Sequence, residues 1–176
     1  PLSEPITFNV KPLYKETALE GASAEEFIAF IDELEDMQTA LSATTYNMDE
    51  SMKKVKAMQM ALGRTDGDIA GIAKQVYDLK QQLMQLQLEV EGNPAKEMIG
   101  EKNNPTVSDR FSMAYRGAST TYGPTELHKQ SLTMAKNQLV TIDSKLTAII
   151  DEIPTLEQQL YQAGAPWIQG SNMERY

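Results

Sequence analysis

The sequence predicts an all-helical protein, and three observations support that prediction. Apolar residues recur at alternating spacings of three and four along three long stretches, which is the period of an amphipathic helix. Aromatic residues make up only 7% of the 176 residues, whereas Leu, Ala, Gln and Lys are frequent and there are 10 Met, a balance that favours helix over strand. Short polar links separate the stretches. We therefore expect an antiparallel four-helix bundle whose helices alternate up-down-up-down around one core.

The first helix is expected to begin after Ser23 and to run for about forty residues. Ser23 and Glu26 have the spacing of a capping box, in which each side chain accepts a hydrogen bond from the other residue's backbone N–H. An apolar stripe then extends from Phe27 to Leu62, widened by several Met. Gly63 is expected to end the helix.

The second helix is expected to begin with Thr65 or Asp66 as its cap. Its apolar residues keep one register from Ile69 to Val90, and residues 92–94 (Gly-Asn-Pro) end it. Because the link from the first helix is so short, the second must fold back along the first as an αα-hairpin.

The third and fourth helices follow a polar connector over residues 92–105. Residues 106–109 (Thr-Val-Ser-Asp) predict the start of a short third helix that ends near Gly117. Pro124 is expected to be the first residue of the fourth helix, whose stripe runs in one register from His128 to Leu160. Pro154 lies inside that stripe and predicts a bend, because the register continues beyond it.

The two ends of the chain differ from the helices. Ile6, Phe8 and Val10 alternate with polar residues, the period of a half-buried strand. We expect residues 1–22 to be a strand-like segment and linker from a preceding β domain, residues 23–164 to form the bundle, and residues 165–176 to be an ordered non-helical tail packed on it. An extended homodimeric coiled coil is the structural alternative.

The composition disfavours several classes of function. The net charge is −9, which disfavours nucleic acid and anionic membrane surfaces as partners. Lys53, Lys54 and Lys56 form the only dense basic group, and we interpret it as a solvated helix face. The chain has no Cys and no apolar run of the roughly 18 residues that span a bilayer, so neither a thiol site nor membrane insertion is expected. It begins without Met, which suggests a fragment or a processed product.

The candidate chemical groups do not combine into a predicted catalytic, cofactor or metal site. His128 is the only histidine and falls on the apolar stripe, so we expect a half-buried structural residue. Di-iron bundles need Glu-x-x-His on two helices, and that motif is not present. The acidic residues between Glu25 and Asp36 lie early in a helix, where they complement its dipole. Residues 66–68 (Asp-Gly-Asp) lack the later ligands of a calcium loop.

The C-terminal tail is expected to anchor the chain on the bundle. Trp167 is the only Trp, and it follows a helix-ending Gly-Ala-Pro. A large aromatic side chain gains roughly 1.5–3 kcal/mol by burial. We therefore predict that Trp167, Tyr161, Pro166 and His128 are interaction or anchoring residues.

The last third of the chain carries a family pattern. Its pieces are Val107-Ser-Asp-Arg110, Tyr115-Arg-Gly117, a helix led by Pro124, Asp151-Glu-Ile-Pro154-Thr-Leu156, and Ala163-Gly-Ala-Pro-Trp167. This pattern resembles the C-terminal end of the large secreted bacterial sortilin-like β-propeller proteins of the BNR (Asp-box) kind, often labelled glycosyl hydrolases. Residues 5–12 resemble the final strand of the family's β-sandwich-like stretch. The resemblance implies export to the periplasm, cell surface or medium, and it places any hydrolase or ligand-binding activity on propellers outside this chain.

These observations favour a non-catalytic structural and interaction module at the C-terminus of such a protein. Its expected partners are the parent's other domains or another protein, with a homo-oligomer open. Two alternatives remain. One is a helical module that binds a peptide or small ligand in a Met-lined groove or one centred on Trp167. The other is an accessory domain of a glycoside hydrolase whose active site lies elsewhere. We expect no cofactor.

Overall fold

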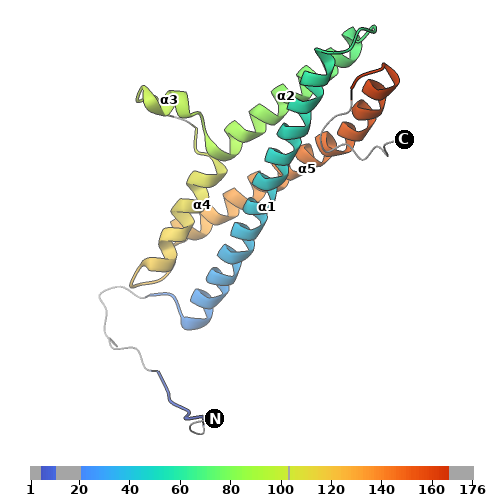
Figure 1. Ribbon diagram of the computed structural model, residues 1–176. Helices are drawn as coiled ribbons and strands as arrows, with labels where there is room; N and C mark the ends of the chain where they lie inside the picture. The colour runs from blue at the N-terminus through green and yellow to red at the C-terminus, as the bar shows by residue number, and fades with distance from the viewer. Residues whose placement is uncertain (1–4, 11–20, 103, 167–176) are drawn as a thin grey trace.

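The computed structural model describes residues 5–10, 21–102 and 104–166. These residues form helices and connecting segments without any strand, so the prediction of an all-helical protein is confirmed. Three long helices lie lengthwise against one another, and three shorter ones come between the second and third of them in the chain (Figure 1). The elements in chain order are α1 (Ala24–Leu62), α2 (Ala70–Glu91), α3 (Pro94–Met98), α4 (Val107–Tyr115), the 3-10 helix η1 (Arg116–Ser119) and α5 (Glu126–Gln162). In Figure 1, α3 projects away from the other helices.

The helix directions differ from the expected alternation. Lys129 lies 3.8 Å from Glu26, and Lys136 lies 2.8 Å from Glu33. Because both residue numbers rise together, α1 and α5 run parallel. In Figure 1, α2 runs back along α1, and α4 continues in the direction of α2. The up-down-up-down order is therefore not confirmed, because α2 and α4 run one after the other in the same direction between the parallel α1 and α5.

The core consists mainly of aliphatic side chains and Met, with Phe30, and its residues come from the four helices α1, α2, α4 and α5. In α2 the predicted register is buried from Val76 to Val90, and in α5 it is buried from Leu132 to Leu160. In α1 the buried face is shifted toward the positions that had been expected only to widen the stripe. The buried residues of α1 are Phe30, Leu34, Met37, Thr44, Met48, Ser51, Met52, Val55, Met58, Ala61 and Leu62.

The first two helix boundaries correspond only in part to the predicted ones. The capping box at Ser23 is confirmed, with its hydroxyl 3.1 Å from the Glu26 nitrogen. Gly63 follows the last residue of α1, but its φ of −66° is ordinary right-handed backbone. The predicted cap of α2 at Thr65 or Asp66 is wrong, because α2 begins only at Ala70 and no side chain caps it. The Thr65 hydroxyl instead donates to the carbonyl of Ala61 at 2.8 Å.

The later boundaries agree more closely with the sequence. Thr106 caps α4 with Asp109 as its reciprocal partner. Pro124 lies one residue before the cap of α5, so the prediction that it opens the helix is off by two positions. Pro154 stays inside a helix that continues to Gln162, so it does not end α5.

The N-terminal segment does not form the expected strand. Residues 5–10 have no regular structure, and Ile6, Phe8 and Val10 are 84%, 78% and 85% exposed. An alternating pattern needs a neighbouring strand to pair with, and the part of the chain that the structure describes offers none. At the other end, Trp167 and the rest of the tail lie outside the described residues.

Candidate functional site

His128 is a helix-capping residue. It lies in the first turn of α5, where its Nδ1 accepts a hydrogen bond from the backbone N–H of Thr125 at 3.1 Å and lies 3.0 Å from the Thr125 hydroxyl. Its ring packs on the backbone of η1, so closely that a Cβ added at Gly117 would lie 2.9 Å from its Cγ. The imidazole is thus held by α5 and η1, with one ring nitrogen engaged by the backbone.

Tyr161 and Pro166, two of the other predicted anchoring residues, lie at the far end of α5 from His128. Tyr161 is 58% exposed and is 33 positions further along α5, which corresponds to roughly 50 Å of helix. Pro166 is exposed beside it, and Trp167 lies outside the described residues. The structure therefore does not bring His128, Tyr161 and Pro166 into one site.

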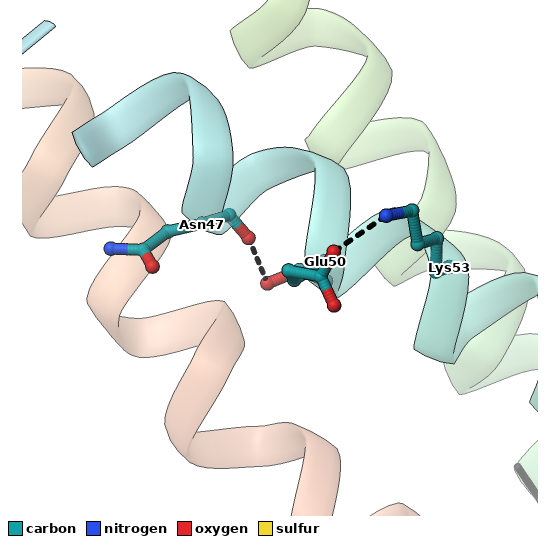
Figure 2. A network of polar contacts seen from close by, with 4 residues as sticks. Asn47, Glu50 and Lys53 are labelled. Atoms are coloured by element: carbon teal, nitrogen blue, oxygen red, sulfur yellow. Dashed lines mark hydrogen bonds and ion pairs between the residues drawn. The ribbon is translucent and has the colours of Figure 1, made fainter. Parts of the chain in front are cut away.

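The charged residues of α1 lie mainly on its surface. Figure 2 shows Lys53 bonded to Glu50 at 2.6 Å, a pair one turn apart on an exposed helix face. The hydrogen bond and the charge of Glu50 raise the pKa of Lys53. Glu26 and Glu33 form ion pairs with lysines of α5. In the ranges that the structure describes, no three acidic or histidine side chains are grouped as a metal site would require.

The carboxyl of Glu157 on α5 is buried, and its burial was not predicted from the sequence. Glu157 is only 6% exposed, and its Oε1 has no hydrogen-bond partner among the described residues. Burial raises its pKa, while the positive charge of Lys54 on α1 lowers it to a smaller extent. The sequence pattern could have indicated this burial, because Glu157 lies four positions after Ile153 and next to Leu156, two residues of the apolar stripe of α5.

The methionines in the described ranges do not form one binding surface. Met37, Met48 and Met58 are buried in the core. Met52 and Met84 border a groove of about 400 Å³ between α1 and α2, together with Lys53, Lys56 and Lys80. Met134 is exposed on α5. The expectation of a Met-lined groove thus applies to two side chains at most, and lysines surround them.

A larger concavity of about 640 Å³ lies where α2, the α3–α4 connector and α5 meet. We call it the amide cleft, because five of its lining side chains are carboxamides: Gln85, Asn93, Asn104, Asn137 and Gln138. Its size falls within the usual range of ligand sites. The sequence analysis did not identify this cleft, because its residues come from three separated stretches and none of them forms a motif.

The walls of the amide cleft are fixed by local hydrogen bonds. Asn93 caps α3, its Oδ1 accepting from the backbone N–H of Ala95 at 3.0 Å. Thr106 begins α4, its hydroxyl and backbone N–H both bonded to Asp109. Gly92, with a φ of 90°, turns the chain between α2 and α3 in a conformation that favours glycine. The chain can therefore offer ligands a preformed surface of hydrogen-bonding groups.

Comparison with known proteins identifies no relative. No protein-family model, curated protein or solved structure matches the chain. None of the helices in the described ranges is both long and apolar enough to cross a membrane.

Proposed function

We propose that this chain is a non-catalytic structural and interaction module, a helical bundle at the C-terminus of a larger exported β-propeller protein. The observation that carries the proposal is the chemical nature of the amide cleft. Its polar lining side chains are five carboxamides, the hydroxyls of Thr106 and Thr141, and the charged Glu89 and Lys96. Carboxamides bind by hydrogen bonding, and they are neither nucleophiles nor proton-transfer groups.

The position of His128 supports the same proposal. A general base needs a free ring nitrogen directed at a substrate, with a partner that orients the other nitrogen. Here the Nδ1 atom of His128 accepts from the backbone N–H of Thr125, so in the neutral ring the proton is on Nε2 and neither nitrogen is free to take up another, and Gly117 packs against part of the ring. This arrangement stabilises the α4–α5 junction, which is a structural role.

The proposed parent and its export rest on the resemblance to sortilin-like propeller proteins. In that arrangement residues 1–22 connect the preceding β domain to the bundle, residues 23–164 form the bundle, and residues 165–176 are the tail. Backbone contact supports a fixed connection to the bundle, because Ala22 donates to the carbonyl of Tyr122 at 2.8 Å. The proposed partners are the parent's other domains or another protein.

Crosslinking of the parent protein followed by mass spectrometry tests the proposal. Lys96 borders the amide cleft, whereas Lys74 projects from α2 and pairs with Asp78 of the same helix. We expect crosslinks from Lys96 to sequences outside the helical region, and few from the control position Lys74. Absence of any such crosslink, with unchanged stability of the parent after deletion of the helical region, would contradict a structural and interaction role.

A second experiment tests the non-catalytic part. The isolated chain is incubated with a panel of aryl glycosides, and release of the aryl group is measured. We expect no turnover above that of a heat-denatured sample. Turnover that is abolished by Gln138→Leu but retained in Gln158→Leu, an exposed position elsewhere on α5, would show that the amide cleft is an active site.

A further inference from the structure

We propose that the amide cleft binds an extended peptide segment of a partner through that segment's main chain. This inference rests on the proposed function, because it assigns a partner chemistry to the interaction module. Each peptide group presents one N–H donor and one C=O acceptor. A carboxamide presents the same pair, so a row of carboxamides can match a row of peptide groups.

The first supporting observation is that these amides are not used within the chain. Among the described residues, no hydrogen bond holds the side-chain amides of Gln85, Asn104, Asn137 or Gln138. The Gln138 Oε1 atom is also buried without a partner. A buried acceptor without a hydrogen bond is unfavourable, so rotation of this amide toward a donor in the cleft would be favoured.

The second observation is the arrangement of the polar groups. Gln85 and Glu89 are four positions apart on α2, and Asn137 and Thr141 are four positions apart on α5, so each pair lies on one helix face. Leu88 and Ile142 also line the cleft and supply apolar surface. Such a surface offers hydrogen-bonding groups from two helices together with apolar contact, and an extended chain can use both simultaneously.

The third observation concerns the aromatic content and the charge of the residues that line the cleft. None of the described residues that line the cleft is aromatic, whereas sugar rings and nucleobases are commonly held by stacking on aromatic rings. Glu89 is paired with Lys145 at 3.4 Å. That pair removes much of the negative charge at one edge, and Lys96 lies at another. The cleft therefore favours an uncharged, strongly hydrogen-bonding ligand, and main-chain peptide groups are of this kind.

Nuclear magnetic resonance of the whole chain can test the proposal with a defined probe. The probe is acetyl-Thr-Val-Thr-Val-Thr-amide, a capped and uncharged peptide that favours extended structure. Maltotriose serves as the carbohydrate comparison. We expect the peptide to shift the side-chain amide resonances of Asn137 and Gln138, and to leave that of Gln158 unchanged. Shifts caused by maltotriose alone, or no shift with either probe, would overturn the proposal.

Substitutions make the test specific. Gln138→Leu and Asn137→Ala should each weaken peptide binding about fivefold, as expected for the loss of one neutral hydrogen bond. Gln158→Leu is the matched control and should bind as the unsubstituted chain does. Because Gln138 is partly buried, the Gln138→Leu variant must first show an unchanged circular dichroism spectrum. Asn137 is exposed, so Asn137→Ala provides the test if Gln138→Leu fails to fold. Equal binding by Asn137→Ala and the control would overturn the proposal.

The outcomes separate this inference from the proposed function. If Lys96 crosslinks to the parent but the peptide does not bind, the interaction module stands and the main-chain recognition is wrong. If the peptide binds but the helical region makes no contact with the parent, the cleft is a peptide site and the structural role is wrong.

Discussion

The contact between Gly117 and His128 supports a quantitative prediction about the α4–α5 junction. A methyl group added by Gly117→Ala would lie 2.9 Å from the His128 Cγ and 3.0 Å from both its Cβ and Nδ1. Carbon atoms normally approach to about 3.5–4.0 Å. The methyl group therefore overlaps the root of the imidazole and the ring, which cannot move away without disturbing the first turn of α5.

The expected magnitude follows from two opposing effects. Overpacking of this kind costs roughly 1–3 kcal/mol. Replacing Gly by Ala inside a helical segment recovers about 0.5–1 kcal/mol. The net destabilisation is therefore about 0–2.5 kcal/mol with a central value near 1 kcal/mol, which in a chain of this length lowers the melting temperature by roughly 2–4 °C. Thermal unfolding followed by circular dichroism at 222 nm measures the shift.

A double-mutant cycle isolates the cause. His128→Ala alone should cost about 0.5–2 kcal/mol, because α5 loses its capping acceptor, and His128→Gln should cost less because Gln can still accept at this position. In the His128→Ala background the contacts with Cγ and Nδ1 are absent and only the Cβ contact at 3.0 Å remains, so Gly117→Ala should be clearly less destabilising than in the unsubstituted chain. If Gly117→Ala is equally destabilising in both backgrounds, the explanation by contact with the imidazole is wrong.

Three further predictions concern the core, the buried carboxyl and the tail. Leu83→Ala and Leu146→Ala should each destabilise the chain by about 2–5 kcal/mol in urea unfolding, because both side chains are buried, and losses under about 1 kcal/mol would contradict a shared core. Glu157→Gln should raise the melting temperature at pH 7 and raise it less near pH 4. Burial raises the folded-state pKa of Glu157, so ionisation of this carboxyl destabilises the fold increasingly as the pH rises through that pKa. An equal effect of the substitution at both pH values would contradict this. Trp167 should show blue-shifted fluorescence that resists acrylamide quenching if it packs on the helices, and Trp167→Ala should lower the melting temperature by several degrees; a red-shifted, freely quenched Trp167 would contradict the anchor.

The local features of the fold were predictable because their causes are local. The capping boxes at Ser23 and Thr106 require only residues three positions apart, and both are present in the structure. The stripe of α5 from Leu132 to Leu160 was predictable because a helix that buries one face must repeat its apolar residues at the helical period. The continuation of α5 through Pro154 followed from the same repeat.

The arrangement of the helices was not predictable in the same way. Short links suggested simple alternation, but the connector after α2 leads into α4 in the direction of α2, so that α1 and α5 become parallel neighbours. The sequence of residues 92–105 does not determine the direction of α4, because that direction depends on which apolar helix faces fit together. The amide cleft was missed for a related reason, because carboxamides on a helix surface have no distinctive spacing. The strand at Ile6 to Val10 was inferred from an alternation that finds no partner among the described residues.

The parallel pairing of α1 and α5 has a consequence for the order in which the chain can fold. The contacts that join these helices connect residues far apart in sequence, 103 positions in the case of Glu33 and Lys136, and 99 for Thr44 and Asp143. During synthesis, α1 and α2 can form a hairpin early, but the apolar face that α5 covers stays open until more than sixty further residues have been added. Closing such large loops slows folding relative to helical proteins with mostly neighbouring contacts. The nascent α1–α2 hairpin is therefore the state in which this protein is most exposed to aggregation and to capture by chaperones.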